Sequence, residues 1–278
     1  APLPCSGFPA TFGILFNMKL SSIIAARHRI DSQQDLLFTV DTSINGQLFV
    51  EFDSALNYSG VIDWGDGSSN TVLSGTGNSG TNHTYSTTNT FQVKVSGTQV
   101  PRFRLDYQLN VVSVENLGNV GIQNTSIMFD GCSNLTSANI GDYITSIDFR
   151  AFFNCLGLTS ATIGNSVTST GESSFSSCTS LTSVSIGSSV TSIGLQTFAF
   201  CSSLTSIIIP SSVTSIGVNA FSMLTNSSSL GSISCLAMAA PALGSSAFNN
   251  VLATTIEVPI GATGYGTTYG GLTVNYVL

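Results

Sequence analysis

Apolar positions recur with a constant step of 23 residues through the second half of the chain. The step relates one phenylalanine series (Phe129, Phe152, Phe175, Phe198, Phe221) and one cysteine series (Cys132, Cys155, Cys178, Cys201). It also relates a leucine series (Leu135, Leu158, Leu181, Leu204) and an isoleucine series (Ile140, Ile163, Ile186, Ile209). A fixed period of this length is typical of stacked units, each too small to bury its apolar face alone. The pattern therefore predicts a solenoid, which we expect to occupy residues 99–278.

Each repeat predicts two short strands. In Leu181–Ile186 apolar and small polar residues alternate, which favours a parallel strand with Leu181, Val184 and Ile186 near the core. Val190–Ile193 predicts a second strand on the opposite side of the coil. We expect the phenylalanine and cysteine series to pack inward from the segment between these strands, and serine and threonine to face outward.

The pattern is imperfect at both ends of the array. Val111–Leu117 lies one period before Leu135–Ile140 and predicts a degenerate first repeat that caps the array. Residues 223–255 break the register, because Phe248 follows Phe221 by 27 residues instead of 23. Residues 256–278 are expected to close the solenoid, and their last strand, Leu272–Leu278, carries no charge that would discourage edge pairing.

Residues 34–98 predict a separate small β-sandwich. Short alternating runs (LLFTVDT, GQLFVEFD, GVIDWGDG and FQVKVSG) are separated by turns rich in Gly, Asn and Ser. We expect Trp64 to fill the core of this sandwich. Residues 1–33 are apolar and punctuated by Pro and Gly, which predicts an arm that docks either on its own domain or, by strand addition, on a neighbouring subunit.

Charge is scarce and argues against nucleic acid as a partner. Charged residues make up 8% of the chain, the net charge is -7, and residues 151–278 contain no Lys or Arg. Binding to phosphates requires clustered cations, which are missing here. No apolar run is long enough for a membrane-spanning helix.

We expect a secreted or cell-surface protein. The chain begins at Ala1 rather than Met, which fits the removal of a signal peptide. Five Asn-x-Ser/Thr sequences are candidate N-glycosylation sites, and sugars there would add hydration to a chain with few charges. They lie at Asn57, Asn82, Asn124, Asn134 and Asn226.

The cysteines favour buried thiols over metal ligands. A spacing of 23 residues is unlike the close cysteine pairs of zinc sites, and a stacked cysteine column behaves as a small hydrophobic series. Cys5 and Cys235 stand outside the column, and a disulfide between them, or with a neighbouring molecule, stays open. We expect neither a metal nor a cofactor.

No catalytic motif emerges from the sequence. The only histidines are His28 and His83, and neither lies near a nucleophile motif. Asp63, Asp66 and His83 resemble a catalytic or Ca²⁺-binding group, but we expect the two aspartates to cap a turn and His83 to hydrogen-bond locally. A non-enzymatic role is therefore expected.

Two family resemblances refine this picture. Val61–Gly67, His83–Tyr85 and Phe91–Val95 together resemble the signature of a PKD-type domain, an Ig-like sandwich that serves as a spacer or adhesive module in extracellular proteins. The repeats TSIDFRAFFNCLGLTSATIGNSV, TSTGESSFSSCTSLTSVSIGSSV and TSIGLQTFAFCSSLTSIIIPSSV resemble BspA-like leucine-rich repeats, whose consensus is close to TSIGxxAFxxCSSLTSIxIPxSV. This resemblance implies a surface protein concerned with adhesion or architecture.

Two functions follow as hypotheses. The first is a structural protein that assembles with copies of itself into a fibre or surface layer through the N-terminal arm and the ends of the solenoid, because uncovered strand edges favour pairing. The alternative is a monomeric adhesin that binds a host protein or glycan through the solenoid face.

Overall fold

The computed structural model describes residues 35–52, 58–75, 79–100, 102–122, 124–223 and 228–278. The described residues belong to one unit, Asp35–Leu278, and every regular element among them is a β-strand. None of them forms a helix with the length and apolar character needed to cross a membrane. The predicted arm, including Cys5 and His28, lies outside the described residues.

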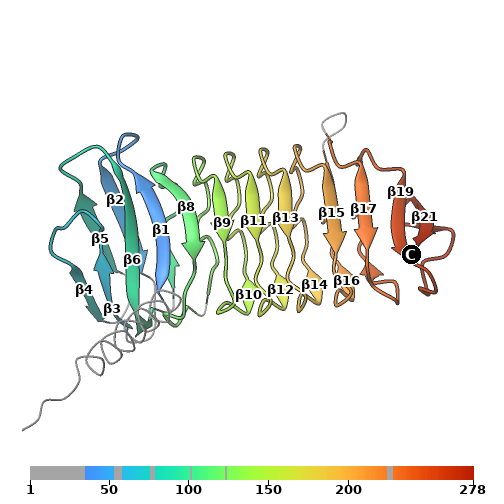
Figure 1. Cartoon of the computed structure of the whole chain (residues 1–278), viewed down its shortest axis with the longest axis horizontal. Helices are drawn as coiled ribbons and strands as arrows, with labels where there is room; N and C mark the ends of the chain where they lie inside the picture. The colour runs from blue at the N-terminus through green and yellow to red at the C-terminus, as the bar shows by residue number, and fades with distance from the viewer. Residues whose placement is uncertain (1–34, 53–57, 76–78, 101, 123, 224–227) are drawn as a thin grey trace, which may run out of the picture. The chain divides into compact units, whose positions relative to one another are not determined.

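Eight strands precede the repeats and build a two-sheet sandwich (Figure 1). They are β1 (Leu36–Asp41), β2 (Gln47–Phe52), β3 (Tyr58–Asp63), β4 (Thr71–Gly75), β5 (Ser79–Thr84), β6 (Thr90–Gln99), β7 (Phe103–Arg104) and β8 (Val111–Asn116). One sheet runs in the order β8-β1-β6-β3-β4 and the other in the order β5-β2-β7. The sandwich predicted from the alternating runs is therefore present.

Strict alternation of buried and more exposed residues along the strands creates the sandwich core. Every second residue of β1 and β2 is buried, and Trp64 is 1% exposed. Phe103 on β7 joins the two sheets, because its ring makes edge contacts with Phe38 on β1 and Phe52 on β2 at centroid distances of 5.9 and 5.7 Å. Burying each such side chain contributes about 1.5–3 kcal/mol.

The sandwich and the solenoid share one sheet. β8 pairs antiparallel with β1 of the sandwich and parallel with β9 (Ser137–Asn139) of the first complete repeat. Thus the capping repeat expected at residues 111–117 is built into the sandwich. The expectation of two open solenoid ends is wrong at the N-terminal end, because β1 covers the edge that β8 would otherwise expose. The domain limits at residues 33 and 98 stay predictions.

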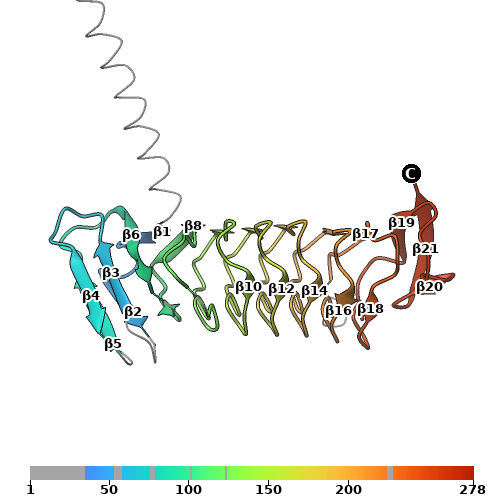
Figure 2. The same ribbon diagram turned by 90° about the horizontal axis from the view of Figure 1, so that it is seen from below.

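The repeats form two series of parallel strands on opposite sides of the solenoid (Figure 2). The long face contains β8, β9, β11 (Ser160–Thr162), β13 (Ser183–Ser185), β15 (Ser206–Ile209), β17 (Ser232–Cys235), β19 (Thr255–Pro259) and β21 (Leu272–Val277). The short face contains β10 (Ser146–Ile147), β12 (Ser169–Thr170), β14 (Ser192–Ile193), β16 (Ser215–Ile216) and β18 (Ala242–Leu243), and β20 (Thr268–Tyr269) turns back onto β21. The register follows the repeat, since Ser160 pairs with both Ser137 and Ser183.

A stack of phenylalanine rings runs through the solenoid. Neighbouring rings from Phe129 to Phe221 have centroids 5.1–5.5 Å apart and are nearly parallel. Phe248 continues the stack at 5.4 Å from Phe221 in spite of its longer spacing. The extra residues of the broken register therefore leave the core path intact.

Candidate functional site

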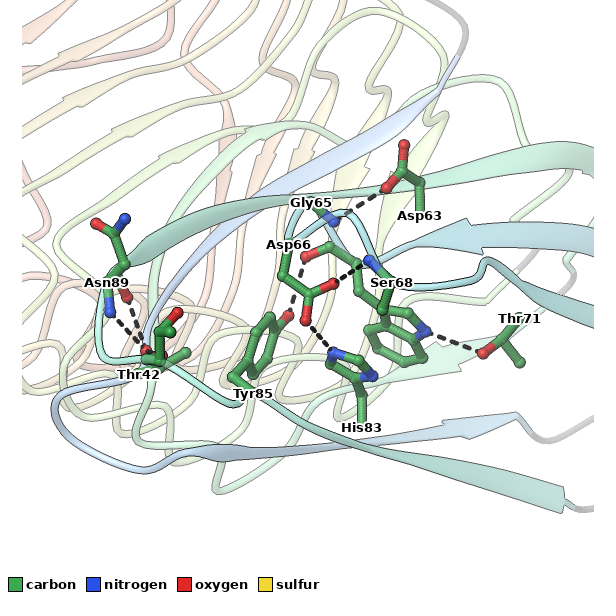
Figure 3. A network of polar contacts seen from close by, with 11 residues as sticks. Thr42, Asp63, Gly65, Asp66, Ser68, Thr71, His83, Tyr85 and Asn89 are labelled. Carbon is green, nitrogen blue, oxygen red and sulfur yellow. Dashed lines mark hydrogen bonds and ion pairs between the residues drawn. The ribbon is translucent and has the colours of Figure 1, made fainter.

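A small network of polar contacts in the sandwich surrounds Trp64 (Figure 3). Asp66 Oδ2 lies 2.8 Å from His83 Nε2. The His83 ring stacks on Trp64 with centroids 4.6 Å apart and meets Tyr85 edge-on at 4.5 Å. Trp64 Nε1 donates a hydrogen bond to Thr71 Oγ1 at 2.9 Å. The network thus fixes the turn after β3 against the sandwich core.

The aspartates of this turn are occupied by backbone donors. Asp63 Oδ1 accepts a hydrogen bond from Gly65 N, and Asp66 Oδ1 accepts one from Ser68 N, both at 3.0 Å. Asp63 points away from the Asp66–His83 pair (Figure 3). Burial by itself raises the pKa of Asp66, but the hydrogen bonds from Ser68 and His83 outweigh it and lower the pKa to about 2.

This geometry suits a structural role. The structure places Asp66 and His83 together and keeps Asp63 apart, so these two carboxylates do not face one cleft. No group of three or more His, Cys, Asp or Glu side chains in the described part of the chain is placed to hold a metal ion.

The cysteine column is a chain of buried thiol donors. Cys155, Cys178 and Cys201 each donate from Sγ to the carbonyl oxygen of a phenylalanine 26 residues earlier, at 3.1–3.2 Å. Burial raises the pKa of the Cys132, Cys155 and Cys201 thiols, so they stay protonated. Cys235 is also buried and reduced, and it lies 3.2 Å from the Tyr265 hydroxyl.

Three candidate glycosylation sites fall within the described residues. Asn82, Asn124 and Asn134 are all exposed. Asn134 Nδ2 donates to the Leu109 carbonyl at 3.0 Å. Asn57 and Asn226 lie outside the described residues.

The long face contains one interruption that the repeat pattern did not predict. Thr136, Thr159 and Thr182 each donate both the backbone N–H and Oγ1 to a carbonyl of the preceding coil. At Thr205 this series stops, and β13 and β15 are not hydrogen-bonded to each other in the described structure. The bond from Ile163 N to Ser185 O likewise has no counterpart from Ile186 to Ile208.

The short face shows no such interruption. Thr168, Thr191 and Thr214 continue the same double hydrogen bonds, and its five strands form one unbroken sheet. The coil that contains β15 is therefore hydrogen-bonded normally on one side of the solenoid and separated on the other.

A column of glycines at equivalent positions of successive coils, Gly141, Gly164 and Gly187, explains the difference between the two faces. A Cβ at Gly164 would lie 1.8 Å from the Gly141 carbonyl oxygen, and one at Gly187 would lie 2.2 Å from the Gly164 oxygen. Only glycine permits this approach. The next residue in the column is Pro210, whose ring cannot fit at the same spacing. The short face keeps glycine throughout, at Gly171, Gly194, Gly217 and Gly244.

The separation opens a cleft of about 500 Å³ between β13 and β15. Its walls carry the apolar side chains of Val184, Ile186, Ile208 and Leu236 and several serine hydroxyls, with no charged residue. Ile208 is 60% exposed and Leu236 48%. Val184 and Ile186 were expected near the core; they pack against it but stay half-buried, because the neighbouring coil stands away from them.

Two of the uncovered sheet edges lie at opposite ends of the unit Asp35–Leu278 (Figure 1). β4 pairs only with β3, and Val72 on it is 73% exposed. β20 pairs with Leu272 and Thr273 of β21, and Val274 N donates to the Thr267 carbonyl, which leaves the outer edge of β21 unpaired from Asn275 onward. Tyr276 on that edge is 45% exposed.

Comparison with known proteins identifies the repeats. Residues 121–254 match six copies of the BspA type leucine rich repeat region. The predicted fold class is therefore confirmed: a β-sandwich is followed by a parallel-strand solenoid, and residues 121–254 of that solenoid match the BspA type leucine rich repeat region. The PKD-type resemblance of the sandwich stays a prediction.

Several solved structures are similar over part of the chain. A leucine-rich repeat protein from Bacteroides ovatus is 27% identical over 54% of this chain and 38% of its own, with a TM-score of 0.42. The T. pallidum leucine rich repeat protein is 19% identical over 58% and 72%, with a TM-score of 0.40. A leucine rich cell surface protein from Faecalibacterium prausnitzii is 18% identical over 62% and 66%, with a TM-score of 0.32. This chain thus spans about two fifths of the Bacteroides ovatus structure, and the comparison with curated proteins gives no match.

Proposed function

We propose that this protein is a non-enzymatic structural protein, extracellular or at the cell surface, that assembles with copies of itself into a fibre or layer. Leucine-rich repeats of the BspA type, the scarcity of charge and the exposed glycosylation sequences support the location. The observation that carries the assembly is a pair of uncovered edges at opposite ends of the described unit, β4 and the part of β21 that β20 does not cover (Figure 1). An unpaired row of backbone donors and acceptors is a template for a further strand.

The two edges belong to different surfaces of the same molecule. A contact between them is heterologous, and a heterologous contact that does not close into a ring extends into a filament. Residues 151–278 carry only two charges, Glu172 and Glu257, so little electrostatic repulsion opposes approach at the β21 end. The N-terminal arm supplies a second contact in this proposal.

The test is the state of association of the purified full chain. We expect sedimentation velocity to show growing species as the concentration rises, and negative-stain microscopy to show filaments or sheets. Tyr276→Lys places a charge at the β21 edge and should reduce assembly. Leu195→Lys, at a 37% exposed position in the middle of the solenoid, is the matched control and should assemble normally. A full chain that stays monomeric at every concentration would refute the proposal.

A second candidate function rests on the cleft of the long face. Its volume is within the range of small-ligand sites, and its hydroxyl groups can hydrogen-bond a sugar or a peptide. In this alternative the protein is a monomeric adhesin for a host protein or glycan. Saturable binding of monomeric protein to a glycan or matrix-protein array, lost in Ile208→Glu, would favour it over self-assembly.

A further inference from the structure

The cleft between β13 and β15 restricts what can fill it. No charged side chain lines it, so an ionic group placed there would lose its hydration without gaining a counter-charge. The exposed Ile208 and Leu236 side chains favour an apolar occupant. The Thr205 and Ile186 amides, which do not form the bonds that their equivalents make, favour an occupant with backbone hydrogen-bonding groups. An uncharged extended peptide meets all three conditions.

The chain contains such a peptide outside the described residues. In Thr11–Leu20 every second residue is apolar, namely Phe12, Ile14, Phe16, Met18 and Leu20. This is the period of a β-strand with one apolar face. Lys19 is its only charged residue, and it belongs to the other face of that pattern.

We propose that the cleft receives Thr11–Leu20 from the arm of a second copy of this chain. The inference rests on the proposed function and names the site at which the arm acts. Phe12 or Phe16 is the anchor that inserts between Ile186 and Ile208, and the remaining apolar residues of the strand cover Leu236. A single aromatic anchor in a desolvated pocket commonly dominates such a contact.

The attachment point and the length of the arm permit this contact in an end-to-end assembly. Asp35 lies at the C-terminal end of β8, since the Asn116 amide donates to its carbonyl oxygen at 3.4 Å. Gly141 contacts Asn116, so the glycine column and Pro210 lie on the same rim of the long face. Asp35, to which the arm is joined, and the cleft therefore lie on one rim.

The span follows from the strand order. If β4 of one copy follows β21 of the next, seven strand spacings separate β1 from the β15 of its neighbour, or roughly 34 Å. Residues 21–34 join the apolar strand to β1 and reach about 46 Å when extended. The linker is therefore long enough with some slack.

A glycan is the competing occupant. Sugar sites usually include an aromatic ring on which the pyranose stacks, and none of the residues that line the cleft is aromatic. The hydroxyl groups of Ser183, Ser185 and Ser206 are the features that a glycan would use.

The experiment is a complementation between two defective chains. One lacks residues 1–34 and keeps the cleft, and the other keeps the arm and carries Ile208→Glu in the cleft. Both chains also carry Tyr276→Lys, so that pairing between the β4 and β21 edges does not contribute to association. We expect each chain alone to be monomeric in sedimentation velocity and an equimolar mixture to form a 1:1 dimer. Phe12→Ser together with Phe16→Ser in the arm-bearing chain should weaken the dimer on the order of thirtyfold.

The outcomes separate this inference from the proposed function. If the full chain with Ile208→Glu assembles as well as the unmodified chain and the mixture stays monomeric, the cleft is not the arm site, although self-assembly stands. If the full chain never assembles, both fail. In a further mixture the arm-bearing chain carries Leu195→Glu in place of Ile208→Glu, so that its cleft is intact. If this chain is still monomeric alone and the mixture forms the same 1:1 dimer, the assignment would also be overturned. Binding of the arm-deleted chain to a glycan array, lost in Ile208→Glu, would replace the peptide by a sugar.

Discussion

Gly187 and Pro210 occupy the same position in successive coils, and the hydrogen-bonded ladder of the long face ends between them. Gly187 approaches its predecessor Gly164 so closely that a Cβ would lie 2.2 Å from a carbonyl oxygen. A proline ring following at that spacing would collide with Gly187. The change from glycine to proline therefore falls at the coil where the long face opens into the cleft.

Pro210→Gly is expected to close the cleft. Glycine restores the space, so the Thr205 and Ile186 amides should gain the hydrogen bonds that their equivalents make. Two new backbone bonds contribute roughly 1–3 kcal/mol, which offsets about 1 kcal/mol for the added freedom of glycine in the unfolded chain. Hydrogen exchange resolved by residue would then show slower exchange at both amides.

Pro259→Gly is the control for this change. Pro259 lies in β19, which is already paired with β21, so its replacement should leave exchange at Thr205 unchanged. If Pro210→Gly leaves exchange at Thr205 and Ile186 as fast as before, the glycine column is not the cause of the interruption.

The sequence predicted the solenoid because the same side-chain volumes return in every coil. The sequence also predicted a closing strand at Leu272–Leu278, and the structure places this strand at Leu272–Val277. β4 and β5 escaped prediction, since their residues are mostly polar or small and become strands through pairing with β3 and β2. Pairing partners far apart in sequence are not visible in a local pattern.

The cleft was not predicted from the sequence for a different reason. The repeat consensus that the chain resembles has proline at the position of Pro210. Pro210 therefore matches the consensus, and the glycines at the equivalent positions are the residues that depart from it. Only the backbone distances reveal that three consecutive glycines set a spacing that proline cannot follow. The signal available in the sequence was the change from glycine to proline within one column.

Gly194→Ala should destabilise the protein strongly. Its Cβ would lie 2.3 Å from the Thr170 carbonyl oxygen on the unbroken short face, where the backbone has to shift to make room. Overpacking of this kind costs about 1–3 kcal/mol. Gly231→Ala is the control, because the nearest atoms to its Cβ are 3.8 Å away. Urea unfolding of both variants gives the comparison, and equal midpoints would contradict the tight packing of the column.

The column thiols should resist alkylation in the folded protein. Burial raises the pKa of Cys132, Cys155 and Cys201, so almost no thiolate exists at neutral pH and reagent access is blocked. A Cys5→Ser variant leaves only the five described thiols. We expect iodoacetamide at pH 8 to label none of them in the native state and all five in urea, as counted by mass spectrometry. Labelling of a column cysteine under native conditions would show that the coils open.

The contacts of Asp66 with Ser68 and His83 should make stability depend on acid pH. The folded pKa of Asp66, about 2, is below the usual aspartate value near 4. A carboxyl group with a lowered folded pKa contributes its full stabilisation above the unfolded pKa, and this is lost as the pH falls towards 2. Urea unfolding between pH 6 and pH 2 should therefore show a decline that is smaller in Asp66→Asn. Asp63→Asn is the matched control, because Asp63 binds only the turn backbone and its replacement should leave the decline in place. Parallel profiles for Asp66→Asn and the unmodified chain would mean that the contacts of the Asp66 carboxylate with Ser68 and His83 do not stabilise the sandwich.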